Sequence, residues 1–362
     1  MSAKPLKAGI LGATGTVGQR FINLLSTNPT FEIAVLGASE RSAGKKYNDA
    51  TNWKLADRMP ENVKALTVCV CDPAHFSSCD VVFSGLDANI AGEIEKSFIE
   101  AEFPVFSNAK NFRMYDRVPL VIPLVNPEHL AVVSEQQKEF NLKKGFIVTN
   151  SNCAVTGVAV ALKALQLKFG DISHVLATTM QAISGAGYPG VPSLDIMDNV
   201  VPFIGGEEPK FEAELMKLLG TVNQTCTGFD SKSNMKVSAS CNRVPVVDGH
   251  LASVSIKFAS ANPPSVDQVV ECLQNYKSES QILGCYSAPE IAIDVRMESD
   301  RPQPRLDRMN GNGMSVTVGR VRECSVFDIK FSVLAHNTII GAAGASILNA
   351  EVAYKMGLVF PK

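Results

Sequence analysis

The chain has 362 residues, of which 46% are hydrophobic and 19% charged, and this composition excludes a disordered protein. Its length allows two domains, and its formal net charge of -2 gives no reason to expect nucleic acid or a membrane surface as a partner. No apolar run reaches transmembrane length, the first residues show no signal peptide, and nine cysteines without a CxxC pair indicate reduced thiols. We therefore expect a soluble, cytoplasmic protein.

The first part of the chain alternates short apolar strands with helices. Strands are predicted at 6–11, 31–36, 67–70, 81–85 and 104–106, and helical spacing of apolar residues appears at 19–25 and 91–101. Alternating strands and helices are typical of a parallel, doubly wound sheet. We predict a Rossmann-like α/β domain over residues 1–150.

The pattern changes after residue 150. A helix is predicted from 153 to about 169, a strand at 173–180, an irregular glycine-rich stretch to 206 and a charged helix at 207–219. Long alternating strands follow within 236–259 and 314–335, with a helix at 265–276 between them. We predict an inserted mixed α+β domain for catalysis and dimerisation over 151–336. A helix rich in Ala and Gly from Asn337 to Met356 lies in a last segment, 337–362, that we expect to complete the first domain.

A glycine turn follows the first predicted strand and precedes the first predicted helix. Its glycines, at 12, 15 and 18, form the pattern G-x-x-G-x-x-G. Such a turn lets backbone N–H groups and a helix N-terminus approach a pyrophosphate closely. We expect a dinucleotide there, bound by Gly12, Thr14, Gly15, Thr16 and Val17.

The loop after the second strand indicates which dinucleotide is bound. NAD-specific folds place an acidic residue about 20 residues beyond the glycine turn, to hold the ribose hydroxyls. Here Ser39 occupies that position, with Arg41 and Ser42 close by, although Glu40 lies between them. Hydroxyls and a guanidinium suit a 2′-phosphate, so we predict NADP(H); the alternative is an ordinary solvated loop.

Cys153 differs from the other cysteines in its local setting. Ser151 or Asn152 can cap the helix, which leaves Cys153 in the first turn among unpaired N–H groups. That position favours thiolate and predicts a lowered thiol pKa. The small neighbours Ala154 and Gly157 leave room for a substrate. We interpret Cys153 as a nucleophile, against the alternative of a buried packing residue.

A cysteine nucleophile needs a partner for proton transfer, and the chain has only five histidines. His250 follows Asp248 and Gly249 between two predicted strands, where its side chain can face a cleft. His336 is the main alternative to His250 as the proton-transfer partner of Cys153. Arg243 could share the cleft with His250 and bind a carboxylate through two hydrogen bonds.

Seven motifs, taken in order, resemble those of aspartate-semialdehyde dehydrogenases. They are "GATGTVG", "GASERSAGK", "SNCAVTG", "QAISGAGYPG", "GGEEPK", "NRVPVVDGH" and "HNTIIGAAGASI". The compact second domain is similar to that of the archaeal and fungal branch. The resemblance implies an NADPH-dependent, reversible reductive dephosphorylation of L-aspartyl 4-phosphate to L-aspartate 4-semialdehyde through a cysteine thioester. This reaction belongs to the biosynthesis of threonine, methionine and, in some organisms, lysine.

The resemblance also implies a role for individual residues. Cys153 matches the nucleophile and His250 the acid/base residue, whereas no metal is expected. The substrate-binding positions are Arg243 for the α-carboxylate, Glu207 for the ammonium group with Glu208 as the alternative, Gln181 and Asn152 for the acyl group, and Arg113 and Lys210 for the phosphate. Ser184, Gly185 and Asn337 match positions around the nicotinamide end of the cofactor.

Rival hypotheses remain at this point. N-acetyl-γ-glutamyl-phosphate reductase shares the scaffold and the cysteine chemistry, but it acts on an acylated amine and needs no acid for a free ammonium group. Glyceraldehyde-3-phosphate-type dehydrogenases use related thioester chemistry, but the loop after the second strand lacks their acidic residue. A third hypothesis is a non-catalytic sensor of NADP(H) or redox state, which would need no phosphate-binding residues. The partners implied by the resemblance are the substrate, inorganic phosphate and further copies of the chain in a homodimer or homotetramer.

Overall fold

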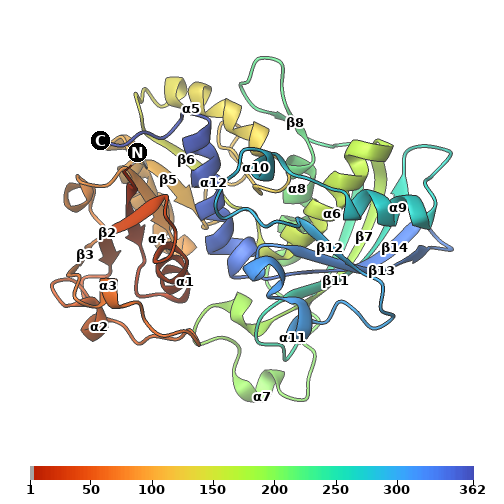
Figure 1. Ribbon diagram of the computed structural model, residues 1–362, viewed down its shortest axis with the longest axis horizontal. Helices are drawn as coiled ribbons and strands as arrows, with labels where there is room; N and C mark the ends of the chain where they lie inside the picture. The colour runs from red at the N-terminus through yellow and green to blue at the C-terminus, as the bar shows by residue number, and fades with distance from the viewer. Residues whose placement is uncertain (1–3) are drawn as a thin grey trace.

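The computed structural model describes residues 4–362, which form two six-stranded sheets with helices packed on and between them, and one two-stranded sheet (Figure 1). The first sheet is entirely parallel and has the order β3-β2-β1-β4-β5-β6. Its strands are β1 (Leu6–Leu11), β2 (Phe31–Ala38), β3 (Val68–Val70), β4 (Val81–Ser84), β5 (Pro104–Ser107) and β6 (Phe146–Thr149). The strands β4, β5 and β6 are buried along their whole length, as expected for a parallel sheet covered on both faces.

The helices around the first sheet come from both ends of the chain. They are α1 (Thr16–Leu25), α2 (Tyr47–Ala50), α3 (Glu61–Lys64), α4 (Ala88–Glu100), α5 (Val133–Glu139) and α12 (Gly344–Lys355). The C-terminal helix α12 packs against α1, β4 and β5, and Figure 1 shows it between the two sheets.

The second sheet is mixed and has the order β10-β7-β11-β14-β13-β12. Its strands are β7 (Ile172–Gln181), β10 (Lys236–Arg243), β11 (His250–Phe258), β12 (Ile293–Arg296), β13 (Val316–Glu323) and β14 (Ile329–Ala335). Strand β7 runs parallel to β10 and antiparallel to β11, so the end of β7, the end of β10 and the start of β11 meet at one edge. The predicted fold class, a Rossmann-like parallel sheet plus a mixed α+β domain, is confirmed.

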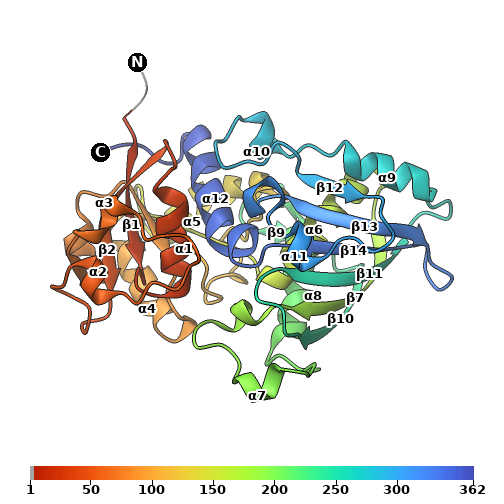
Figure 2. The same cartoon turned by 60° about the horizontal axis from the view of Figure 1, so that its bottom comes forward.

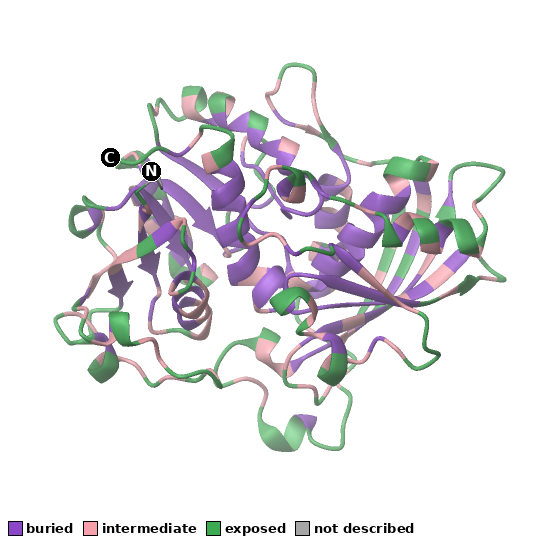
Figure 3. Cartoon of the chain, in the orientation of Figure 1, coloured by how far each residue is buried: buried purple, intermediate pink, exposed green. Residues whose placement is uncertain are grey.

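One face of the second sheet is covered by three helices, α6 (Cys153–Phe169), α8 (Glu207–Leu218) and α9 (Val266–Gln274). Helix α6 is apolar nearly all round, and residues 154–165 are all buried, as expected for a helix in the centre of a core. On the opposite face alternate residues of β7, namely His174, Leu176 and Thr178, are exposed (Figure 3). We call this exposed side the open face of the second sheet.

The remaining elements are short. They are α7 (Ser193–Ile196), α10 (Glu279–Ile282), α11 (Pro304–Asp307) and the hairpin of β8 (Thr221–Val222) with β9 (Phe229–Asp230). The loop around α7 projects from the second domain (Figure 2).

The sequence patterns predict neither the hairpin of β8 and β9 nor strand β12, and they place the start of α1 three residues too late. Within residues 4–362, no helix combines the length and hydrophobicity needed to cross a membrane.

The predicted continuous helix from Asn337 to Met356 is wrong in its first part. A wide turn at Ile339–Ala343 comes first, Ala342 leaves helical geometry, and the regular helix α12 begins only at Gly344. The carbonyl of Ala342 instead accepts a hydrogen bond of 2.6 Å from Asn150 Nδ2. The turn also brings Gly341 against the nucleophile region, since a Cβ on Gly341 would lie 3.0 Å from Cys153 Cβ. A tertiary contact therefore overrides the local helix preference.

Candidate active site

The site lies where β6 passes into α6. Asn152 caps the helix, because its Oδ1 accepts a hydrogen bond of 2.7 Å from the backbone N–H of Ala154. Cys153 is the first residue of α6, at the predicted position. Asn150 fixes the preceding loop, since its Nδ2 donates to Ala342 O and, at 2.7 Å, to Ser346 Oγ. Two loops far apart in the sequence thus hold the nucleophile's helix end.

His250, at the start of β11, faces the cysteine. Its Nε2 lies 3.2 Å from Cys153 Sγ, and its Nδ1 accepts a hydrogen bond of 3.0 Å from the backbone N–H of Ala182. A neutral imidazole carries one proton, so this contact assigns the proton to Nε2, facing the sulfur. Burial, followed by the charge of Arg243, lowers the pKa of His250 to about 3. His250 is therefore neutral at physiological pH.

The other histidines lie elsewhere in the described part of the chain. Nδ1 of the rival, His336, accepts from the backbone N–H of Thr338 at 3.3 Å, and burial lowers its pKa to about 4. His129 is in the core against Asn126, and His174 is on the open sheet face. Among residues 4–362, His250 is the histidine that contacts Cys153 Sγ.

The predicted lowering of the thiol pKa is wrong for the site as the structure shows it. Burial, followed by the charge of the nearby Glu207 carboxylate, raises the pKa of Cys153 to about 12. The cations Arg113, Arg243 and Lys210 oppose this shift without reversing it. The largest contribution is burial of the sulfur, which the sequence does not show, and it acts against the lowering expected from the helix N-terminus.

Arg243 and Gln181 lie side by side at the ends of β10 and β7, where they are direct partners in the sheet register. Both side chains are buried. Arg243 Nη1 donates to Ala182 O at 2.8 Å, so Ala182 contacts Arg243 through its carbonyl and His250 through its N–H. Gly185 is close to both, because a Cβ there would lie 2.9 Å from His250 Cε1 and 3.0 Å from Arg243 Nη1.

Glu207, the first residue of α8, points into the same site. Its carboxylate accepts from Asn152 Nδ2 at 2.8 Å and forms an ion pair with Lys210. Although burial acts to raise it, the hydrogen bonds from Lys210 and Asn152 lower the pKa of Glu207 below its ordinary value. Glu208, in contrast, accepts from the backbone N–H of Cys241 in β10. The geometry thus places Glu207, and not Glu208, beside the nucleophile.

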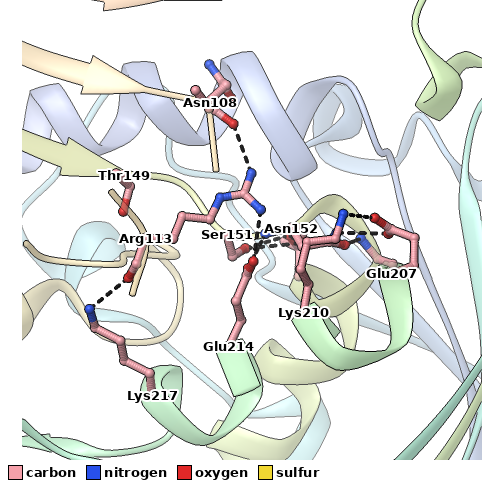
Figure 4. A network of polar contacts seen from close by, with 12 residues as sticks. Asn108, Arg113, Thr149, Ser151, Asn152, Glu207, Lys210, Glu214 and Lys217 are labelled. Atoms are coloured by element: carbon pink, nitrogen blue, oxygen red, sulfur yellow. Dashed lines mark hydrogen bonds and ion pairs between the residues drawn. The ribbon is translucent and has the colours of Figure 1, made fainter. Parts of the chain in front are cut away.

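Arg113 reaches the site from the loop after β5. Its Nη1 donates to Glu214 Oε1 at 2.9 Å and its Nη2 to Asn108 O at 2.9 Å (Figure 4). Glu214 also accepts from the backbone N–H of Asn152 at 2.5 Å.

Glu214 was not singled out in the sequence, although it lies seven residues after Glu207 and four after Lys210, a spacing that puts all three on one helix face. Asn108 and Asn150 were missed as well, because isolated asparagines carry no signal of their contacts.

The glycine turn has the geometry that a dinucleotide requires. Gly12 has a positive φ of 74°, and a Cβ there would lie 2.9 Å from Gly85 O. A Cβ on Gly18 would lie 2.2 Å from Gly12 O, so α1 can start against the turn only with glycine there. Thr14 lies in the turn, Gly15 is the residue that precedes α1, and Thr16 and Val17 form its first turn, where N–H groups lack helical partners.

The remaining cofactor candidates fall into two groups. Ser39, Arg41 and Ser42 form a turn after β2, closed by a hydrogen bond of 2.9 Å from Ser42 N to Ser39 O. Strand β2 itself contacts the glycine turn, since Ala13 N donates to Gly37 O at 2.9 Å. Asn337 and Ser184 meet on the side of Cys153 and His250: Asn337 Nδ2 donates to Ser184 Oγ at 2.8 Å. The first group therefore lies beyond the end of β2, near the glycine turn, and the second lies beside His250.

Comparison with known proteins identifies the family. The model described as "Semialdehyde dehydrogenase, NAD binding domain" matches residues 7–133, and "Semialdehyde dehydrogenase, dimerisation domain" matches residues 162–340. The aspartate-semialdehyde dehydrogenase of Schizosaccharomyces pombe is 61% identical over 98% of this chain and 99% of its own. The chain belongs to the aspartate-semialdehyde dehydrogenase family. The Archaeoglobus fulgidus member is 48% identical over 97% of this chain and 98% of its own, so the predicted archaeal and fungal branch is confirmed.

A solved aspartate-semialdehyde dehydrogenase has the same fold over its full length. The Candida albicans enzyme with NADP superposes with a TM-score of 0.91 at 53% identity, covering 98% of this chain and 99% of that one. The Vibrio cholerae aspartate semialdehyde dehydrogenase II superposes with a TM-score of 0.74 at 26% identity, over 97% and 98% of the two chains. Both comparisons span both sheets, so the two-domain arrangement is that of the family.

Proposed function

We propose that the protein catalyses the reversible, NADPH-dependent conversion of L-aspartyl 4-phosphate to L-aspartate 4-semialdehyde and inorganic phosphate, as an aspartate-semialdehyde dehydrogenase. The observation that carries the proposal is the contact of 3.2 Å between Cys153 Sγ and His250 Nε2 at the N-terminus of α6. A buried arginine, an acid and two further cations surround this pair, which suits a substrate with a carboxylate, an ammonium group and a phosphate. The product would enter the biosynthesis of threonine, methionine and, in some organisms, lysine.

The polar groups divide by the charge that each would bind. Arg243 would hold the α-carboxylate and Glu207 the ammonium group, with Gln181 and Asn152 beside the acyl carbon. Lys210 and Arg113 would bind the phosphate. Lys210 pairs with Glu207 in the structure, so substrate binding would exchange the partners of these two side chains. The substrate ammonium group would replace Lys210 at Glu207, and Lys210 would then bind the substrate phosphate. The site stays close to neutral throughout the exchange, which limits the desolvation cost.

The chemistry proceeds through sulfur. With the imidazole proton of His250 on Nδ1, Nε2 takes the proton of the Cys153 thiol, and the resulting thiolate attacks the acyl carbon. The bond from the acyl carbon to the phosphate oxygen then breaks, so that inorganic phosphate leaves and a thioester remains on Sγ. When bound, NADPH supplies a hydride to the thioester carbonyl. The thiohemiacetal on Cys153 then releases the aldehyde and regenerates the sulfur nucleophile. Each step places negative charge on sulfur or on the carbonyl oxygen, within reach of His250.

His250 would serve the proton movements from Nε2. Its Nε2–H can donate to the thiolate and to the oxygen that becomes negative, which stabilises both. Before Nε2 can accept a proton, it must give up the one it carries, the imidazole must hold its proton on Nδ1 instead, and the Ala182 N–H must release Nδ1. The acid/base role of His250 thus requires a small movement of the Ala182 peptide during turnover.

The cofactor would extend from the glycine turn to Cys153. The glycine turn (Gly12, Thr14, Gly15, Thr16 and Val17) would hold the pyrophosphate at the start of α1. Ser39, Arg41 and Ser42 would bind the 2′-phosphate, which selects NADP(H). Ser184, Gly185 and Asn337 would surround the nicotinamide, next to Cys153.

The assay follows NADPH absorbance with NADP⁺ and L-aspartate semialdehyde, with and without phosphate, for the wild type and Cys153→Ala. We expect phosphate-dependent NADPH formation that is lost in Cys153→Ala. Turnover only with N-acetylglutamate semialdehyde would instead identify the protein as an N-acetyl-γ-glutamyl-phosphate reductase. NADPH binding without turnover of either aldehyde would favour a sensor.

The assembly belongs to the same proposal. Residues 162–340 match the family's dimerisation domain, so the chain is built to associate with copies of itself. We propose a homodimer or homotetramer formed through a catalytic and dimerisation domain, 151–336, with an NADP domain of 1–150 completed by 337–362. The open face of the second sheet and the packing of α12 on β4 and β5 support this division. Light scattering on the purified protein distinguishes the two assemblies; the cytoplasmic location stays a prediction.

A further inference from the structure

Helix α8 carries four charged residues on one buried face. Glu207, Lys210, Glu214 and Lys217 alternate in sign, and their spacing of three, four and three residues places them in one row. Glu207 and Lys210 lie beside the nucleophile, as described above. Glu214 is 2% exposed and Lys217 is 4% exposed, although charged side chains are almost never fully buried unless they are paired. The second half of the row therefore calls for an explanation.

Glu214 uses both carboxylate oxygens. Oε1 accepts from Arg113 Nη1 at 2.9 Å, and Oε2 accepts from the backbone N–H of Asn152 at 2.5 Å. One carboxylate therefore joins the guanidinium of the phosphate-binding candidate to the backbone N–H of Asn152, the residue before Cys153 (Figure 4). Charge-assisted hydrogen bonds of this kind are among the strongest in proteins, and they fix direction as well as distance.

Lys217 holds the main chain of the same segment. Its Nζ donates to the carbonyl oxygens of Arg113 at 2.8 Å, Tyr115 at 2.8 Å and Val118 at 3.0 Å. The backbone at Arg113 is thus fixed by Lys217, and its side chain by Glu214 and by the carbonyl of Asn108. Loss of the Glu214 charge should then release the guanidinium while the segment itself stays in place.

We propose that Glu214 is a positioning residue for the phosphate half of the reaction. It holds the Arg113 guanidinium in a fixed orientation and couples it to the N-terminus of the nucleophile's helix. Arg113 has five N–H donors, of which only some are engaged by Glu214 and Asn108, so donors remain for phosphate oxygens. Orienting a cation before binding avoids the entropy cost of ordering it afterwards. The inference rests on the proposed function.

The test compares Glu214→Gln with Glu212→Gln. Glu212 lies on the same helix and also accepts from a backbone N–H, that of Ala239 at 3.0 Å, but it does not contact Arg113 in the structure. In the phosphate-dependent assay we expect Glu214→Gln to raise the KM for phosphate by about tenfold, the effect of one lost charge-assisted bond. The KM for NADP⁺ should stay within about twofold of the wild type. Glu212→Gln should leave both unchanged.

A double-mutant cycle separates positioning from general stabilisation. If Glu214 acts through Arg113, Glu214→Gln adds little to the phosphate KM once Arg113→Ala is present. Additive effects, or an unchanged phosphate KM in Glu214→Gln, would overturn the inference. Should Glu214→Gln fail to fold, Glu214→Asp takes its place, because it keeps the charge but moves the carboxylate away from Arg113. The same change in the KM for phosphate is then expected. Absence of wild-type turnover would instead count against the proposed function itself.

Discussion

Gly185 offers a direct test of the site, because a single methyl group there would press on two side chains at once. A Cβ at this position would lie 2.9 Å from His250 Cε1 and 3.0 Å from both His250 Nε2 and Arg243 Nη1. Gly185 is exposed and does not have a positive φ, so Gly185→Ala introduces no backbone strain. The protein atoms that the added methyl group would press on belong to His250 and Arg243.

The size of the effect follows from the distances. Carbon atoms in contact prefer about 3.5 Å or more, so His250 and Arg243 must move by roughly half an ångström. His250 is fixed by β11 and by the Ala182 N–H, and its contact with Cys153 would be displaced. Since a misplacement of about 1 Å can cost about 100-fold in rate, we expect kcat/KM for the semialdehyde to fall on the order of tenfold. That corresponds to about 1.4 kcal/mol of transition-state stabilisation.

Steady-state kinetics and thermal unfolding of Gly185→Ala are measured together with Gly205→Ala. Gly205 is a matched control, because a Cβ there meets nothing within 4 Å and its φ is not positive. We expect the melting temperature of both variants to match the wild type, with the rate loss confined to Gly185→Ala. A Gly185→Ala enzyme that turns over at the wild-type rate would refute the proposed packing of the site.

Further predictions concern pH, substrate and cofactor. Unfolded histidine takes up a proton below about pH 6.5, whereas buried His250 does so only near pH 3. As the pH is lowered from about 6.5 to 3, the unfolding free energy of the wild type should therefore fall relative to that of His250→Gln, by at most about 1.4 kcal/mol per pH unit. Urea titrations measure this, and parallel pH curves for the two proteins would contradict it. Glu207→Gln should raise the KM for aspartate semialdehyde at least about tenfold but spare an analogue without the amino group, and equal losses for both would exclude an ammonium-binding role. Joint replacement of Ser39, Arg41 and Ser42 should shift the NADP/NAD ratio of kcat/KM towards NAD, and an unchanged ratio would remove these residues from cofactor selection.

Two parts of the molecule could be predicted because their signals are local. The strand, glycine turn and helix at residues 6–25 carry their periodicity and their glycines within twenty residues, and the structure forms β1 and α1 there. Cys153 could be placed at a helix start because Asn152 supplies the cap one residue earlier. Family membership followed from short motifs of the same kind.

Other features depend on residues that are distant in the chain. His250 and Cys153 are 97 positions apart, and Glu214 and Asn152 are 62 apart, so only the meeting of β11, α8 and α6 decides that they touch. The break at Ala342 has the same origin, because its partner Asn150 lies 192 positions earlier in the chain.

The sequence by itself determined the fold class, the family and the position of Cys153 at the start of its helix, since each rests on neighbouring residues. Only the tertiary structure decided which histidine faces Cys153, which of Glu207 and Glu208 points into the site, and the direction of the thiol pKa shift. The physical reason is that desolvation and Coulomb interactions sum over every group packed around an atom. Those groups are brought together by folding and leave no mark in the local pattern of residues.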